Sequence, residues 1–198
     1  NDTEEFLQKN GWIKSWSKFI KRYLYIFFKN QNSLEVFQIL PIHKKILWIN
    51  LSALSFGDCL MDLSGRVLLR DFNIDLFTSK KNANLFLNDK IFSNVFSDHK
   101  MANMNKYDLV IVDSYSTRSI KVKAIIAPFS QYVGMYGYYN GPDINRVLFS
   151  FHQINNLLGY KHNIAQITEL ARCSMSISVK DKETINDLKL PKKFVTIA

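Results

Sequence analysis

Apolar runs and amphipathic segments alternate along the middle of the chain. Uninterrupted apolar stretches such as KILWINL (Lys45–Leu51) and YDLVIVD (Tyr107–Asp113) are typical of strands buried on both faces. The segments between them carry apolar residues at helical spacing, so we expect an α/β fold with a Rossmann-like parallel sheet and flanking helices. The expected strands are Lys45–Leu51, Ile74–Thr78, Val95–Ser97, Tyr107–Asp113 and Tyr132–Met135, and the expected helices are Asp58–Arg70, Lys80–Leu87 and Ser116–Ala127.

A separate helical pattern covers residues 1–30. Aromatic and aliphatic residues recur at spacings of three, four or seven, and basic residues mostly fill the other side. Such a basic amphipathic helix can lie in the interface of an anionic membrane, or it can dock its aromatic stripe on the following domain. Both interpretations stay open and they are compatible. The apolar positions are Phe6, Ile13, Trp16, Ile20, Leu24 and Phe27, and the basic ones are Lys9, Lys14, Lys18, Lys21, Arg22 and Lys29.

The last part of the chain carries two further helical patterns, Ile144–Leu158 and Asn163–Cys173, followed by a polar stretch. We therefore expect an N-terminal helix over residues 1–30, a Rossmann-like domain over residues 44–175, and a linker over residues 176–198. The apolar run Phe194–Ala198 at its end is interpreted as the first strand of a further, C-terminal domain.

Composition and charge narrow the possible partners. The chain has 198 residues, of which 47% are hydrophobic, so it can bury a core of normal size. A formal charge of +9 favours an anionic partner, although an abundance of Lys and Asn accounts for part of it. The two cysteines, Cys59 and Cys173, are expected to be reduced and buried. Neither a transmembrane helix nor a secretory signal peptide is expected.

Several classes of chemistry lack their sequence signatures. The dinucleotide-binding pattern G-x-G-x-x-G, the P-loop and the G-x-S-x-G nucleophile elbow are absent. No Asp-x-Asp pair follows a strand, and no His or Cys cluster has the spacing of metal ligands. We therefore expect neither a metal nor a cofactor. The four scattered histidines are interpreted as ordinary surface or core residues: His43, His99, His152 and His162.

One acidic residue, Asp58, lies where a ligand site is expected in an α/β fold. The first buried strand leads into a small polar loop, Ser52 to Gly57, and then into Asp58 at the start of a helix. Open α/β sheets bind their ligands at the carboxyl ends of the strands. A carboxylate there is stabilised in its ionised form by the helix dipole, and it could accept a proton from a hydroxyl group. Asp is also a favoured helix cap, so spacing alone leaves both roles open.

The order of several motifs resembles the N-terminal half of glycosyltransferase family 9, the ADP-heptose:lipopolysaccharide heptosyltransferases and their relatives. The similarity extends from about Lys44 to Gly159. Its motifs are LSALSFGDCLMDLSGRVLL, NIDLFTSKKNANLF, YDLVIVDSYSTRS and YVGMYGYYNG. The resemblance implies the acceptor domain of a GT-B fold and an inverting, metal-independent transfer from a nucleotide sugar such as ADP-heptose. It implies no cofactor.

The same resemblance implies roles for individual residues. Asp58 matches the general base, Ser52, Ala53 and Gly57 would shape the acceptor pocket, and Ser116 and Arg118 match a segment that faces the cleft. Arg118 could hold an acceptor carboxylate or phosphate, or it could be a solvated arginine at a helix start. The implied partners are a lipopolysaccharide core or lipid A acceptor, a nucleotide sugar bound through a C-terminal domain, and an anionic membrane surface. The implied location is cytoplasmic, peripheral on the inner membrane.

Three departures from the family pattern limit this interpretation. Ser55 and Phe56 are interpreted as insertions before Gly57, and Ser64-Gly65 stands near the place of a usual proline. The nucleotide-sugar motifs of the family have no counterpart in these residues. One alternative is therefore a non-catalytic acceptor- or partner-binding module of the same fold. The other alternative is a Rossmann-like nucleotide or nucleic-acid binder. It ranks last because no basic stripe with interleaved aromatics occurs outside the N-terminal helix. No nucleic-acid partner is therefore expected.

Overall fold

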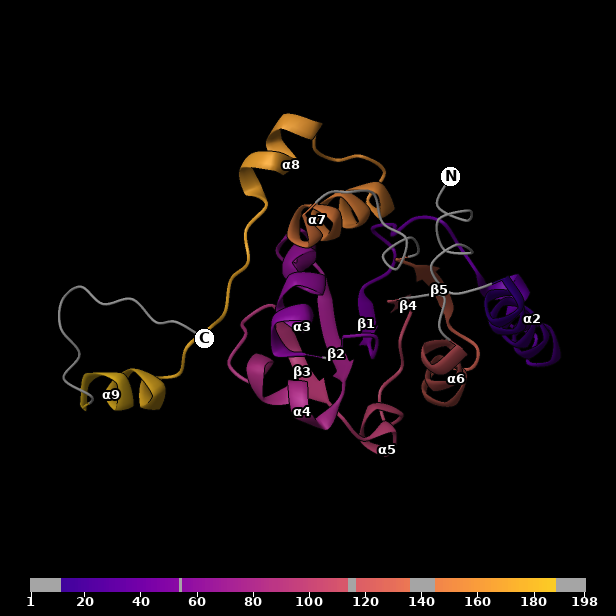
Figure 1. Ribbon diagram of the computed structural model, residues 1–198, viewed down its shortest axis with the longest axis horizontal. Coiled ribbons are helices and arrows are strands. Elements are labelled where there is room, and N and C mark those ends of the chain that lie inside the picture. The colour runs from indigo at the N-terminus through magenta and orange to yellow at the C-terminus, as the bar shows by residue number, and fades with distance from the viewer. Residues whose placement is uncertain (1–11, 54, 114–116, 136–144, 188–198) are drawn as a thin grey trace.

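The chain forms a five-stranded, fully parallel sheet with helices on both faces, in a computed structural model that describes residues 12–53, 55–113, 117–135 and 145–187 (Figure 1). The strand order is β3-β2-β1-β4-β5. The α/β Rossmann-like fold expected from the alternation of apolar runs and helical patterns is confirmed. The strands are β1 (Lys45–Asn50), β2 (Asn73–Thr78), β3 (Phe92–Phe96), β4 (Leu109–Val112) and β5 (Gln131–Gly134).

The strand order places a topological switch point between β1 and β4. From β1 the chain moves outward to β2 and β3, then returns to the other side of β1 to add β4 and β5. The connections after β1 and β4 therefore leave the sheet in opposite directions, which opens a crevice at the carboxyl ends of these strands. Asp58 follows β1 and Asp113 follows β4, so both lie at this crevice.

The two faces of the sheet bury alternate residues of the same strands. Ile46 and Trp48 of β1 belong to the core under α3 (Phe56–Asp62) and α7 (Arg146–Leu157), whereas Leu47 and Ile49 belong to the core under α6 (Thr117–Ile126). Burial on both faces is the physical reason for the uninterrupted apolar runs in the sequence. Apart from α2 (Trp12–Phe28), the described residues also form α4 (Lys80–Ala83), α5 (His99–Ala102), α8 (Ile164–Leu170), α9 (Val179–Asp187) and the 3-10 turns η1 (Asn32–Leu34), η2 (Ser64–Leu69) and η3 (Asn84–Phe86).

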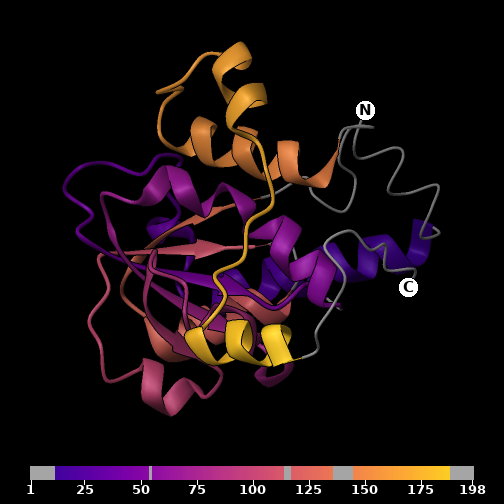
Figure 2. The same cartoon turned by 90° about the vertical axis from the view of Figure 1, so that its left-hand side faces the viewer.

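Helix α2 (Trp12–Phe28) lies beside α6 at the β5 end of the molecule (Figures 1 and 2). It falls within the helix expected for residues 1–30, and residues 1–11 lie outside the described part of the chain. After α2, the segment around Glu35 and Val36 pairs with Tyr132 and covers the open edge of β5. In the part of the chain that the structure describes, no helix has the length and apolar character that crossing a membrane requires.

Local structure differs from the expectation at four places. The helix expected from Asp58 to Arg70 breaks at Leu63 into α3 and η2, and the helix expected from Lys80 to Leu87 divides into α4 and η3. Helix α5 was not expected, and α9 forms inside the stretch interpreted as a polar linker. Both cysteines are free, but Cys173 is exposed, so the expectation that both are buried holds only for Cys59.

Candidate active site

The loop after β1 is fixed by the carboxylate at the end of β4. Asp113 Oδ2 accepts hydrogen bonds from the backbone N–H groups of Leu51 and Ser52, each at 2.7 Å, and from Ser52 Oγ at 2.6 Å. Its Oδ1 accepts a further bond from Ser119 Oγ in α6 at 2.6 Å. Because these four bonds occupy a buried carboxylate, Asp113 acts as the anchor that joins the two sides of the crevice.

The start of α3 separates the two roles that the sequence left open for Asp58. The N-cap is Ser55, whose Oγ accepts the backbone N–H of Asp58 at 3.1 Å. Asp58 is therefore the third residue inside the helix and does not cap it. The supposed insertion of Ser55 and Phe56 provides this cap and the first helical residue. The carboxylate of Asp58 is left to interact outside its own helix.

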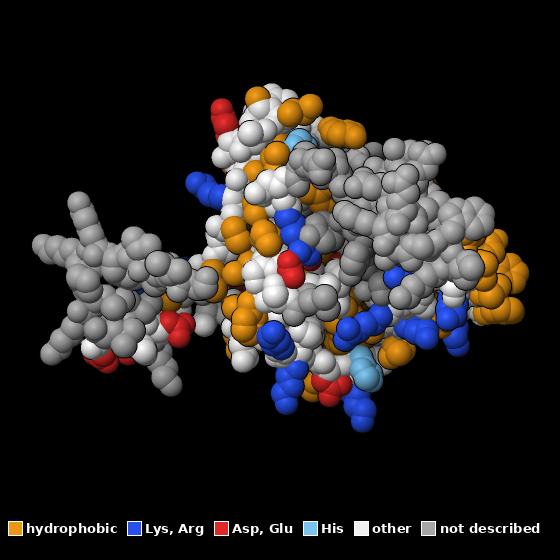
Figure 3. Space-filling view, viewed as in Figure 1, with side chains coloured by type: hydrophobic (Ala, Val, Ile, Leu, Met, Phe, Trp, Pro, Cys, Tyr) orange, Lys and Arg blue, Asp and Glu red, His pale blue; other side chains and the backbone are white. Residues whose placement is uncertain are grey.

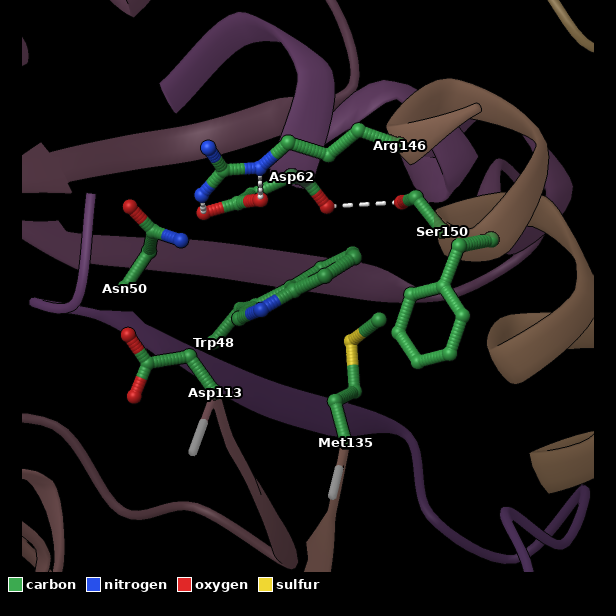
Figure 4. A pocket seen from close by; sticks show the side chains of 8 residues that line it. Trp48, Asn50, Asp62, Asp113, Met135, Arg146 and Ser150 are labelled. Carbon is green, nitrogen blue, oxygen red and sulfur yellow. Dashed lines mark hydrogen bonds and ion pairs between the residues drawn. The ribbon is translucent and has the colours of Figure 1, made fainter. Parts of the chain in front are cut away.

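Arg146, the first residue of α7, joins two carboxylates of α3, and Figure 4 shows its contact with one of them, Asp62. Its Nε donates to Asp62 Oδ1 at 2.7 Å and its Nη2 to Asp62 Oδ2 at 3.0 Å, which is a bidentate pair. Its Nη1 pairs with Oδ1 of Asp58. Asp58 and Asp62 share one helix face because they are four residues apart. One guanidinium therefore holds both acids in a fixed arrangement, while the Asp58 side chain stays 29% exposed.

Close packing of α7 on η2 brings Arg146 to this position. Ser150 Oγ donates to the carbonyl of Asp62 at 2.6 Å and accepts the backbone N–H of Gly65 at 3.0 Å. A Cβ atom on Gly65 would stand only 2.7 Å from the backbone oxygen of Ser150. The glycine is thus required by the approach of two backbones, and it is this approach that sets Arg146 over α3.

Burial is the strongest influence on the second acid. The pKa of Asp62 is raised to about 7, mainly by desolvation; the charge of Arg146 lowers it and the charge of Asp113 raises it. The amide of Asn50 turns toward Asp62 (Figure 4) and helps to hold this pKa down, although its geometry is not that of a full hydrogen bond. Asp62 therefore changes its charge near neutral pH.

A small cavity lies beneath the ion pairs, at the carboxyl ends of β1, β4 and β5. It offers about 20 Å³ to the centre of a water-sized sphere, which is room for about one water molecule and not for a sugar ring. Trp48 Nε1 is buried here without a hydrogen-bond partner. A group as large as a sugar ring could therefore reach Asp58 only from its solvent side. The lining residues are Trp48, Asn50, Asp62, Asp113, Met135, Arg146, Phe149 and Ser150.

The expected acceptor residues differ in their surroundings. Ser52 is half buried at the rim of the crevice, and Ala53 has a buried side chain and a carbonyl that accepts a bond from Asn82 at 3.3 Å. Gly57 is exposed, and a Cβ atom there would meet nothing closer than Ser55 Oγ at 4.0 Å, so the surface beside Asp58 is open. Arg118 is exposed in the first turn of α6, and Ser116 lies outside the described residues. The acceptor-binding role of all five stays a prediction.

Two members of the site, Asp62 and Arg146, were missed by the sequence argument. The spacing of Asp58 and Asp62 was a usable signal, because acids at positions i and i+4 of an expected helix share a face. Arg146 carried no comparable signal, since it lies 88 residues from Asp58 in the sequence. Among the residues that the structure describes, no three His, Cys, Asp or Glu side chains gather as a metal site would require.

The fold of this chain is similar to parts of two solved protein structures. No protein-family model matches the chain, and no curated protein matches it. A solved glycosyl transferase family 9 structure from Veillonella parvula is similar over 78% of this chain, with 14% identity and a TM-score of 0.49. The E. coli heptosyltransferase WaaC, solved with ADP-2-deoxy-2-fluoro heptose, is similar over 62% of this chain, with 15% identity and a TM-score of 0.41.

The chain spans about half the length of these two proteins, 52% and 53% respectively. Both identities are below 25% and both TM-scores are below 0.5. Likenesses at this level concern the fold, and a shared fold by itself does not specify a reaction.

Proposed function

We propose that this chain is the acceptor-binding half of an inverting, metal-independent GT-B glycosyltransferase with Asp58 as its general base. The observation that carries the proposal is the position of Asp58. It lies in the first turn of α3, at the switch point of the sheet, partly exposed and paired with a cation from α7. Support also comes from the ordered motifs that resemble glycosyltransferase family 9, which place a base at this residue.

The proposed reaction needs one proton acceptor and one leaving group. The carboxylate of Asp58 takes the proton of an acceptor hydroxyl while that oxygen bonds to the anomeric carbon of the donor. The bond from that carbon to the nucleoside diphosphate breaks on the opposite side, so the configuration inverts. In this scheme Arg146 and Asp62 are positioning residues, because their bidentate pair fixes the cation that holds Asp58.

The finer assignments belong to the same proposal. The acceptor is a lipopolysaccharide core or lipid A sugar, and the donor is ADP-heptose or another nucleotide sugar that a second, C-terminal domain binds. The site of action is the cytoplasmic face of the inner membrane. The charge of +9 supports an anionic acceptor, and exposed Arg118 at the start of α6 suits its phosphate or carboxylate groups.

The test is sugar transfer by the intact gene product, whose length is first established by mass spectrometry. Asp58→Asn is expected to lower kcat by a factor on the order of 10² to 10⁴, the usual contribution of a general base. The matched control is Asp98→Asn, because Asp98 is an exposed acid that caps α5 and Asn caps a helix equally well.

Circular dichroism and urea denaturation should show both variants folded. Near-normal transfer by Asp58→Asn would remove Asp58 as the base. If the intact protein binds the acceptor and transfers no sugar from any nucleotide donor, the non-catalytic acceptor-binding module replaces the enzyme.

A further inference from the structure

Helix α2 exposes a continuous apolar stripe. Five of its side chains lie within an arc of about 100° of the helix circumference, and they extend over about 16 Å of its length. Their exposed fractions are high for residues of this kind, which are usually covered. They are Trp16 at 46%, Ile20 at 51%, Tyr23 at 65%, Leu24 at 44% and Phe27 at 55%.

A different side of α2 attaches it to the domain. Ile26 is buried in the core shared with α6, and Arg22 is also buried. Tyr25 packs against the same core, and Lys121 of α6 lies over its ring at 5.6 Å. The buried contacts of the helix therefore come from a side other than the exposed stripe. Of the two interpretations left open by the sequence, docking of the aromatic stripe on the domain does not describe this arrangement.

Exposed basic side chains lie on α2 and directly after it. Lys18 and Lys21 belong to the helix and Lys29 follows its last residue; all three are exposed. Figure 3 shows Lys and Arg side chains beside the apolar side chains that gather over α2 at the right-hand edge. An apolar stripe with Trp and Tyr and a basic polar side is the pattern of a helix that lies in a bilayer interface. Lysines on that polar side are attracted by anionic lipid headgroups.

We propose that the α2 stripe docks the chain on an anionic bilayer surface, with the helix lying parallel to it. A second copy of this chain is a poorer occupant, because two such helices would bring their lysines together as well as their apolar stripes. The choice of a lipid surface rests on the proposed function in one respect, because a lipid-linked acceptor would lie in such a surface. Vesicle binding itself needs neither donor nor acceptor.

The test is flotation of the purified chain with vesicles of phosphatidylglycerol and phosphatidylcholine, compared with phosphatidylcholine alone. One variant removes the stripe by Ile20→Ser, Leu24→Ser and Phe27→Ser. A second removes the charge by Lys18→Gln, Lys21→Gln and Lys29→Gln. The matched control combines Leu87→Ser and Lys90→Gln, since both residues are exposed beside β3 at the opposite edge of the sheet.

The wild type is expected to float with the anionic vesicles, and added salt should weaken this binding. Loss of three lysines should lower the partition coefficient on the order of 100-fold, and loss of the stripe should lower it at least as much. The control should bind like the wild type. Equal binding of all four proteins, or no binding by the wild type, would overturn the proposal.

Size-exclusion chromatography with light scattering separates the competing occupant. A dimer of the wild type that the stripe variant abolishes, together with absent vesicle binding, would assign the stripe to a second copy. Failure of vesicle binding leaves transfer to a detergent-solubilised acceptor unaffected, whereas failure of the proposed transfer leaves vesicle binding unaffected. The two failures are therefore distinguishable.

Discussion

At the scale of single residues, Asp62 shows opposing effects on one carboxylate. Burial disfavours its charged form, and the bidentate contact with Arg146 favours it. The first effect is larger, because the folded pKa is raised from 3.8 to about 7. A folded state that binds a proton more tightly than the unfolded chain is stabilised at low pH.

This shift predicts a pH dependence of stability. As the pH rises from about 4 to about 7, the folded state must release the Asp62 proton against its raised pKa, so the contribution of this group to the free energy of unfolding falls. The loss is on the order of a few kcal/mol. Urea denaturation of the wild type and of Asp62→Asn at pH 4.5 and pH 8 should show this loss. Because the introduced asparagine cannot titrate, the stability of the variant relative to the wild type should be greater at pH 8 than at pH 4.5.

Asp71→Asn is the matched control for that measurement. Asp71 is 73% exposed and meets Lys161 only at 3.7 Å, so its removal should leave a difference from the wild type that hardly varies with pH. If Asp62→Asn also differs from the wild type by a constant amount, the raised pKa of Asp62 is contradicted.

At the scale of elements, the packing of α7 on η2 determines the site. Gly65 and Ser150 bring the two backbones together, and Arg146 follows from the position of α7. Such a contact joins residues 85 apart in the sequence. It therefore leaves no periodic pattern in the sequence, whereas strands β1 and β4 are predicted by local apolar runs.

Gly65→Ala is predicted to displace α7. The new Cβ atom would meet the Ser150 backbone at 2.7 Å, a contact that cannot be relieved by a side-chain rotation. Overpacking of this kind costs about 1–3 kcal/mol. Urea denaturation should show this loss of stability.

Gly57→Ala serves as the control within the same protein. A Cβ atom on Gly57 meets open space, and Ala is a better helix former than Gly, so stability should be retained or slightly increased. An equal loss of stability in both variants would show that backbone contact is not what requires Gly65.

The sequence predicted the parallel sheet, because the sheet depends on local apolar runs. It also predicted that Asp58 follows the first strand at the carboxyl edge of the sheet. The role of Asp58 as a base stays a prediction. The sequence did not resolve whether Asp58 caps α3. The cap is the residue with extended backbone just before the helix, and in the structure this residue is Ser55. The sequence also could not supply Arg146, whose place depends on tertiary packing. The exposure of the α2 stripe also depends on tertiary packing, because an amphipathic pattern does not say which of two apolar sides of a helix meets the core.

At the scale of the whole molecule, the charge of +9 favours an anionic ligand, and in the proposed function that ligand is the acceptor. We predict that the chain binds a phosphorylated lipopolysaccharide-core oligosaccharide and does not bind ADP-heptose. Backbone amide shifts in NMR should change over residues 51–62 and at Arg118 with the oligosaccharide, and the affinity should fall with rising salt because the contacts are charged. ADP-heptose at the same concentration should leave these signals unchanged. Binding of the nucleotide sugar at the β1–β4 crevice, without the oligosaccharide, would assign this half of the fold to the donor and withdraw Asp58 as the base that receives the acceptor proton.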